Sequence, residues 1–116
     1  MVKLILKACD NLGFSCDVVE SKAVYSAQAG RYLNSQAVAG FPDIVGCDAL
    51  GRALFIEVKA SGKRSTLKEH QRRFLIEKID KNAFAVCVDG PDLLLKFYRE
   101  WHQVEAKKAY LLKVLP

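Results

Sequence analysis

Apolar positions in the first third of the chain predict one helix followed by one strand. Residues 2–12 carry apolar side chains at helical intervals and end at Gly13, a residue suited to a helix C-terminus. Residues 14–25 are rich in β-branched side chains and favour a strand, which Glu20-Ser21-Lys22 could interrupt with a turn or bulge. Residues 26–40 show no sustained period, which predicts a long connection of the kind that often carries function.

Two β-rich runs in the middle of the chain predict an antiparallel hairpin. The runs cover residues 41–47 and 52–59, and they are joined by Asp48-Ala49-Leu50-Gly51, with glycine where a positive φ is expected. Because the hairpin is expected to turn near Leu50, it brings the start of the first run beside the end of the second.

The second half of the chain predicts helix, strand and helix. Thr66-Leu67-Lys68-Glu69 matches a capping box and begins a helix expected over 66–81. The apolar run 83–88 suits a buried strand parallel to its neighbour, since the intervening helix is the crossover. A further helix is expected over 91–101, and residues 104–116 could form a strand or a helix. The order α-β-β-β-α-β-α predicts an α/β fold with a mixed β-sheet flanked by helices.

Composition limits the class of protein. The 116 residues suit a single domain over 1–116, large enough to bury about two-thirds of its unfolded surface. A hydrophobic fraction of 51% with 27% charged residues argues against disorder and membrane residence. Lysines break the first apolar stretch, unlike a signal peptide, so we expect a cytoplasmic protein that contacts no membrane. The four cysteines lack zinc-site spacing and are expected to be reduced thiols.

Charged residues near the end of the hairpin predict a metal site. Glu57 and Lys59 project to one face of their strand, and Asp43 is expected beside Ile56 or Glu57, roughly 5 Å away across the ladder. Two close carboxylates repel unless a cation lies between them, and oxygen ligands of this kind suit Mg²⁺ or Mn²⁺. Lys59 could hold or deprotonate an attacking water, or stabilise the negative charge that develops during phosphodiester hydrolysis.

Gln71 is an independent candidate for the same site. It lies with Leu67, Phe74 and Lys78 on the stripe of the expected helix that faces the sheet. A polar side chain facing inward requires a partner, which could be a metal-bound water or a backbone group near Lys59.

Motifs in the centre of the chain resemble those of a nuclease superfamily. The combined pattern resembles the VRR-NUC branch of the PD-(D/E)xK nucleases, over roughly residues 40–88. Its motifs are Gly40-Phe41-Pro42-Asp43-Ile44-Val45, Gly51-Arg52, Phe55-Ile56-Glu57-Val58-Lys59 and Gln71.

The resemblance implies both a fold and an activity. It implies a restriction-endonuclease-like core in which Asp43, Glu57 and the backbone carbonyl of Val58 hold a divalent metal. Lys59 would serve the attacking water and Gln71 would support the site. It also implies structure-selective cleavage of DNA. Stand-alone bacterial and phage members of this branch resemble Holliday-junction resolvases and act as homodimers, whereas large eukaryotic relatives cut flaps.

One metal ligand of the family has no clear counterpart here. Members usually carry a glutamate in the first helix, but residues 2–12 offer only Asp10, towards the helix end. Glu20 is the next candidate, on the expected following strand, and is slightly favoured. Either residue could serve directly or through water, or the ligand could be absent.

Basic residues gather after the predicted metal site in a chain whose formal net charge is +5. This charge suits a polyanionic partner, although ordinary solubility explains it equally well until its location is considered. Beside the predicted site these residues are expected to receive DNA phosphates, although a solvated helix face is their usual role. The predicted DNA-contacting residues are Lys63, Arg64, Lys68, Arg72 and Arg73, extended by Lys22, Arg31 and Tyr32.

The sequence therefore predicts a Mg²⁺- or Mn²⁺-dependent endonuclease that acts on branched DNA, with a four-way junction as the leading substrate. A homodimer would suit two symmetric cuts. Three alternatives remain open: a nuclease-fold DNA-binding module that no longer cuts, a flap-cutting nuclease, and a structural or protein-interaction domain.

Overall fold

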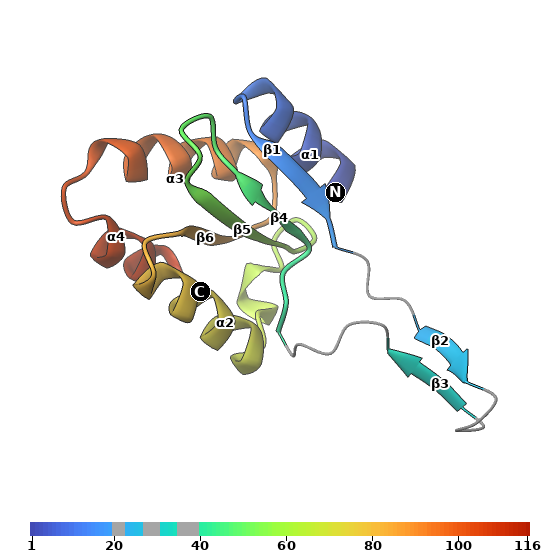
Figure 1. Cartoon of the computed structure of the whole chain (residues 1–116). Coiled ribbons are helices and arrows are strands. Elements are labelled where there is room, and N and C mark those ends of the chain that lie inside the picture. Colours follow the sequence, from blue (N-terminus) through green and yellow to red (C-terminus); the bar gives the residue numbers. More distant parts are fainter. Residues whose placement is uncertain (20–22, 27–30, 35–39) are drawn as a thin grey trace.

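The structure is a computed structural model that describes residues 1–19, 23–26, 31–34 and 40–116. It is an α/β fold in which helices pack against a four-stranded mixed sheet (Figure 1). The described helices are α1 (Val2–Asn11), the 3₁₀ turn Arg64–Thr66, α2 (Glu69–Asp80), α3 (Pro91–Gln103) and α4 (Lys107–Val114). The described strands are β1 (Ser15–Val18), β2 (Ala23–Ser26), β3 (Arg31–Asn34), β4 (Ile44–Cys47), β5 (Ala53–Val58) and β6 (Phe84–Val88).

The main sheet has the strand order β1-β4-β5-β6. β4 runs antiparallel to both β1 and β5, whereas β6 runs parallel to β5 because α2 forms the crossover between them. The predicted mixed sheet, the β4–β5 hairpin and the parallel strand at 83–88 are therefore confirmed. Among the described residues, no helix combines the length and apolarity needed to cross a bilayer.

The strand conformation predicted over residues 14–25 is confirmed for Ser15–Val18 and for residues 23–25, but the stretch forms two strands with different partners instead of one. β1 pairs with β4, whereas β2 pairs with β3 in a second, two-stranded sheet. β3 falls within the connection predicted over 26–40, so that prediction is wrong for Arg31–Asn34. Strands of four residues contain too few alternations for a period to be recognised. The predicted interruption at residues 20–22 lies outside the described residues.

The helix α2 begins at Glu69, and the capping box predicted at Thr66 is wrong. The Thr66 hydroxyl donates to a preceding backbone carbonyl at 2.6 Å, within the 3₁₀ turn. The helix is capped instead by Gln71, whose side-chain oxygen accepts the Lys68 backbone N–H at 3.0 Å. The same oxygen accepts a hydrogen bond from Lys59, so a tertiary contact favours this later start.

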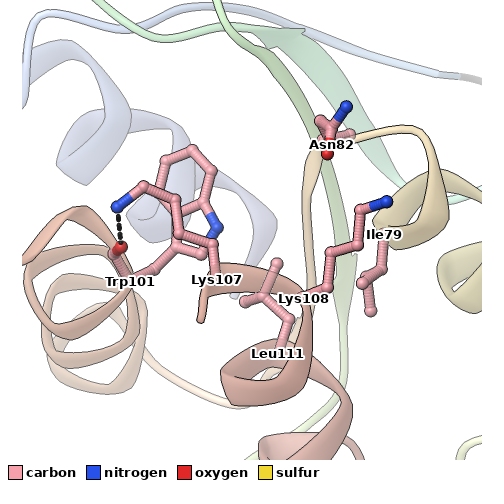
Figure 2. A pocket seen from close by; sticks show the side chains of 7 residues that line it. Ile79, Asn82, Trp101, Lys107, Lys108 and Leu111 are labelled. Atoms are coloured by element: carbon pink, nitrogen blue, oxygen red, sulfur yellow. Dashed lines mark hydrogen bonds between the residues drawn. The ribbon is translucent and has the colours of Figure 1, made fainter. Parts of the chain in front are cut away.

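Residues 104–116, for which strand and helix were both open, form helix α4. Lys107 in its first turn donates from Nζ to the Trp101 carbonyl oxygen at 2.8 Å (Figure 2). It also donates to the Val104 carbonyl oxygen at 2.8 Å. A lysine at this place satisfies the carbonyl groups that the C-terminal end of α3 leaves unpaired. A cavity of about 50 Å³ remains beside this contact, lined by Ile79, Asn82, Ala83, Trp101, Lys107, Lys108 and Leu111.

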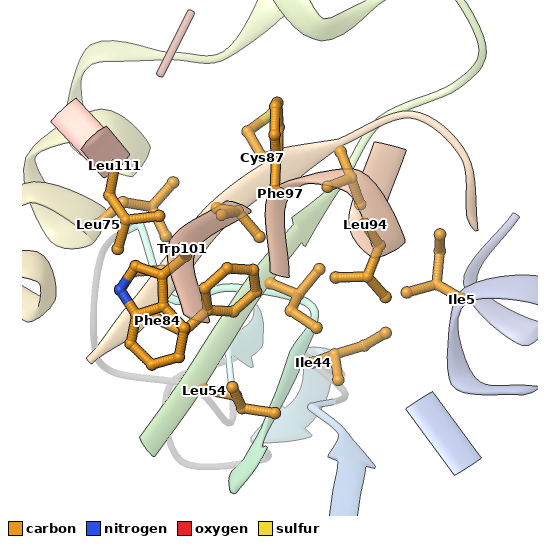
Figure 3. Packing of buried hydrophobic residues seen from close by; sticks show 14 of the residues in the cluster. Ile5, Ile44, Leu54, Leu75, Phe84, Cys87, Leu94, Phe97, Trp101 and Leu111 are labelled. Carbon is orange, nitrogen blue, oxygen red and sulfur yellow. The ribbon is translucent and has the colours of Figure 1, made fainter. Parts of the chain in front are cut away.

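One face of the main sheet packs against α1 and α3. Leu54 of β5 and Ile44 of β4 are fully buried there, together with Ile5 of α1 and with Leu94 and Trp101 of α3 (Figure 3). Burying large apolar side chains of this kind stabilises a fold by roughly 1.5–3 kcal/mol each. This face of the sheet therefore provides most of the core.

The opposite face of β5 carries Phe55 and Glu57 towards α2, since successive strand residues point to opposite faces. The Phe55 ring lies 5.7 Å from the Phe74 ring of α2. Glu57 therefore lies on the face that α2 covers.

A partly buried ion pair holds the β4–β5 turn against α3. The Asp48 carboxylate accepts hydrogen bonds from the Arg52 Nε at 2.7 Å and from the Tyr98 hydroxyl at 2.9 Å. Burial alone would raise the pKa of Asp48, but hydrogen bonds from Arg52 and Tyr98 and the Arg52 charge lower it overall. Asp48 therefore stabilises the fold at neutral pH, and this contribution is lost when the pH falls below the ordinary carboxyl range.

We expect Asp48→Asn to lower the free energy of unfolding at pH 7 by on the order of 2 kcal/mol. Breaking a fully buried ion pair costs roughly 3–5 kcal/mol. Because the Arg52 side chain is 26% exposed, we expect a smaller loss for Asp48→Asn. Urea denaturation measures the difference, with the exposed Asp80→Asn as control. Equal stability of the two variants at pH 7 would contradict the structural role of Asp48.

Candidate functional site

The β4–β5 register brings Asp43 to the backbone of β5. Ile44 faces Ile56 across the ladder, and the Asp43 Oδ2 accepts the Val58 backbone N–H at 2.8 Å. The N–H and C=O of one strand residue face the same side, so the Val58 carbonyl faces the Asp43 side of β5. On its other side, the Asp43 carbonyl oxygen accepts the Val19 N–H at 2.8 Å.

Glu57 is a buried carboxyl group beside Asp43. Only 4% of the residue is exposed. Burial, the charge of Asp43 and hydrogen bonding to it raise the pKa of Glu57 to about 8, although Lys59 acts in the opposite direction. A carboxyl group with such a pKa is commoner at functional sites than elsewhere. The two acidic residues predicted for the site are therefore brought together.

Lys59 and Gln71 complete the polar cluster. The Lys59 Nζ donates to the Gln71 Oε1 at 3.0 Å and lies 3.7 Å from the Glu57 Oε1. The Gln71 Nε2 donates to the same Glu57 oxygen at 3.4 Å. The amide thus links the lysine to the carboxyl group, and the predicted inward orientation of Gln71 is confirmed.

Gly40 lets the Asp43 segment approach the first turn of α2. Its φ is +78°, and a Cβ atom there would overlap the His70 carbonyl oxygen and lie 2.8 Å from its carbonyl carbon. The Phe41 ring packs 5.1 Å from the Phe74 ring of the same helix. Only glycine fits this contact, which brings the chain before Asp43 against the turn of α2 that carries Gln71.

Gly40→Ala should destabilise the protein more than Gly62→Ala does. Gly62 has nearly the same φ, +76°, but nothing lies within 4 Å of its Cβ position. We expect Gly62→Ala to cost about 1 kcal/mol of unfolding free energy from backbone strain, and Gly40→Ala about 2 kcal/mol more from overlap. Thermal or urea unfolding compares them. Similar losses of unfolding free energy in the two variants would show that the close contact of Gly40 with α2 does not contribute to stability.

The donor set of this cluster fits a divalent cation in part. Two carboxyl groups and a backbone carbonyl are hard oxygen ligands, which Mg²⁺ and Mn²⁺ accept together with several waters. The repulsion that raises the Glu57 pKa is the repulsion a cation would relieve. Across the described ranges, however, no three Asp, Glu, His or Cys side chains converge on one point.

Neither candidate for the additional metal ligand, Glu20 or Asp10, is placed at the site by the described residues. Glu20 lies outside the described residues, although Val19 before it is hydrogen-bonded to Asp43. Asp10 is exposed at the end of α1, a helix that packs on the sheet face opposite Glu57. Asp17 is an acidic residue that sequence reasoning does not consider, and it does not converge with Asp43 and Glu57 on one point. It is exposed on β1 and pairs with Val45, so it shares the sheet face of Asp43. Alternation along β1 is the only sequence signal for it.

The predicted DNA-contacting residues fall into three groups. Lys63, Lys68 and Arg73 are exposed near the first turn of α2, although Arg73 forms an ion pair with Glu69 at 3.2 Å. Arg72 is half-buried and donates to the Pro116 carbonyl at 3.3 Å. Arg64 is also half-buried and donates to the backbone carbonyls of Cys87 and Val114. Lys22 lies outside the described residues, and for Arg31 and Tyr32 the structure describes only the backbone of β3.

A scan of protein-family models finds no family that matches this chain. A search among curated proteins finds no match either. The function is therefore inferred from the chemistry of the site and from its motifs.

Glu57→Gln should stabilise the metal-free protein at pH 8. Between the ordinary value of 4.5 and about 8, the unfolded chain releases the Glu57 proton while the folded protein keeps it. The free energy of unfolding therefore falls as pH rises through this window, and the neutral amide avoids that loss. We expect a gain on the order of a few kcal/mol at pH 8 that disappears near pH 4.5.

Urea denaturation in EDTA at several pH values measures this effect. Glu105→Gln, an exposed glutamate, is the control and should follow the wild type. A Glu57→Gln protein no more stable than wild type at pH 8 would show that the folded protein does not raise the pKa of Glu57.

Proposed function

We propose that this protein is a metal-dependent endonuclease that cleaves branched DNA. The observation that supports this most strongly is the buried Glu57 beside Asp43, with Lys59 linked to it through Gln71. An apolar sheet face has no structural need for this cluster, whereas phosphodiester hydrolysis uses each of its members. The four-stranded mixed sheet is compatible with the restriction-endonuclease-like core that the motifs imply.

Each residue has a chemical role in this proposal. Asp43, Glu57 and the Val58 carbonyl would hold Mg²⁺ or Mn²⁺, which when bound supplies charge stabilisation for the phosphoryl group and acidifies water. Lys59 would orient the attacking water or neutralise charge on the phosphoryl oxygens. Gln71 holds the ammonium group of Lys59 at 3.0 Å, and so limits the positions that this cation can take.

The charge around the cluster supports a polyanionic substrate. Lys63 and Lys68 are exposed on the connection that leads from Lys59 to α2, so phosphates bound there would lie near the acidic pair. A four-way junction is the leading substrate, cut by a homodimer with two sites related by a two-fold axis. Selectivity would come from DNA shape, because the basic residues offer phosphate contacts and the sequence shows no feature for base readout.

The test is cleavage of junction, flap, duplex and single-stranded DNA with Mg²⁺, with Mn²⁺ and with EDTA. We expect metal-dependent cleavage of the junction, reduced at least 100-fold in Asp43→Asn, because the loss of one carboxylate charge weakens metal binding. Asp92→Asn is a matched control, since Asp92 also follows a proline but is exposed in the first turn of α3. It should retain wild-type activity.

A second candidate is a DNA-binding module with a nuclease fold that no longer cuts. It is favoured by the convergence of only two acidic side chains within the described part of the site. Its signature would be salt-sensitive junction binding that needs no metal and gives no product. Absence of cleavage on all four substrates, with Asp43→Asn identical to wild type, would reject the endonuclease.

A further inference from the structure

Arg64 is engaged within the fold, at a position where the sequence predicts a phosphate contact. Its Nε donates to the Cys87 carbonyl at 2.8 Å and its Nη2 donates to the Val114 carbonyl at 2.7 Å. Its Cζ lies 5.2 Å from the centre of the Phe97 ring. A single guanidinium group therefore joins β6, α3 and the end of α4.

The Cys87 carbonyl belongs to the residue that pairs with Glu57 in the parallel β5–β6 ladder. Successive carbonyl groups of a strand face opposite sides, and the Val88 carbonyl accepts the Lys59 N–H on the β5 side at 2.9 Å. The Cys87 carbonyl therefore faces the outer edge of the main sheet. Arg64 satisfies a backbone group that the described strands leave unpaired at this edge.

The contact between Arg64 and the Cys87 carbonyl anchors the connection that leads from Lys59 to Gln71. Residues 60–68 join Lys59 on one side to the start of α2 on the other, where Gln71 accepts hydrogen bonds from Lys59 and Lys68. Gly62 is tied to the same end of β6, because its N–H donates to the Asp89 carboxylate at 2.8 Å. Arg64 is the anchor nearer to α2.

We propose that Arg64 is a positioning residue, which through the Cys87 and Val114 carbonyls sets the place of Lys59 and Gln71 relative to Glu57. It does not bind DNA. The positioning of Lys59 and Gln71 is a property of the protein without DNA, so it can be tested without activity. The consequence for cleavage rests on the proposed endonuclease function.

The guanidinium group is suited to this role in a way that an ammonium group is not. It presents donors in a rigid, planar fork, so one side chain reaches two carbonyl groups while stacking on Phe97. Arg64→Lys keeps the charge and loses the fork. If Arg64 contacted a phosphate, the substitution by lysine would be tolerated better than if Arg64 positioned the two carbonyl groups.

Hydrogen exchange of the backbone amides over residues 59–71 tests the positioning directly and needs no activity. We compare Arg64→Ala, Arg64→Lys and, as a neighbouring control, Lys63→Ala, whose side chain is exposed. Both Arg64 variants should exchange at least fivefold faster than wild type at Gly62, Leu67 and Lys68, whose backbone N–H groups are hydrogen-bonded in the wild type, and Lys63→Ala should not. Unchanged exchange in both Arg64 variants would overturn the proposal.

Cleavage and DNA binding provide the second test. Arg64→Lys should lower the cleavage rate at saturating DNA at least tenfold, while the Kd for junction DNA in EDTA stays within twofold of wild type. Lys63→Ala should instead weaken binding and reduce the salt dependence by about one phosphate contact.

A reduced salt dependence in Arg64→Ala or Arg64→Lys, with an unchanged saturating rate, would identify Arg64 as a phosphate contact and overturn the proposal. If the wild type cleaves none of the DNA substrates, the endonuclease function fails, and the exchange rates still decide the positioning role. Arg64→Lys keeps the test decisive if Arg64→Ala does not fold.

Discussion

The structure depends on one unfavourable interaction, the burial of the Glu57 carboxyl group beside Asp43. Burial and a neighbouring negative charge both favour the protonated form, which is why the pKa of Glu57 rises to about 8. The surrounding groups reduce this cost without removing it. Val58 donates its backbone N–H to Asp43, and Lys59 and Gln71 approach Glu57 from the α2 side. A fold selected for stability alone would place an apolar residue at this position.

The elements around this pair are arranged to hold it. Gly40 allows the chain before Asp43 to touch the first turn of α2, and Gln71 in that turn caps the helix while holding Lys59. Arg64 ties the intervening connection to the edge of β6. The Asp43 segment, the end of β5 and the first turn of α2 thus meet around Glu57, joined by the hydrogen bonds of Asp43, Lys59 and Gln71. Side chains restrained in this way can be preorganised for a charged ligand.

Much of the fold follows from local patterns in the sequence. The β4–β5 hairpin was predictable because two β-rich runs flank a turn with glycine at its last position, and that register brings Asp43 beside Glu57. The parallel strand β6 was equally predictable, because a continuous apolar run over residues 83–88 follows a predicted helix. The strand β3 and the separation of β2 from β1 were not, since strands of four residues hold too little periodicity. Helix and strand could not be distinguished for α4.

The sequence by itself determined which chemical groups are present and that two carboxyl groups, a lysine and an inward glutamine share one region. Only the tertiary structure decided what each basic residue contacts. Arg64 and Lys63 are neighbours of similar charge, yet Arg64 satisfies backbone carbonyls while Lys63 is exposed. The start of α2 was decided in the same way, because the Gln71 side-chain oxygen that caps the helix also accepts a hydrogen bond from Lys59, just after β5. Contacts between distant segments have no local signature, since they depend on how the packed elements meet.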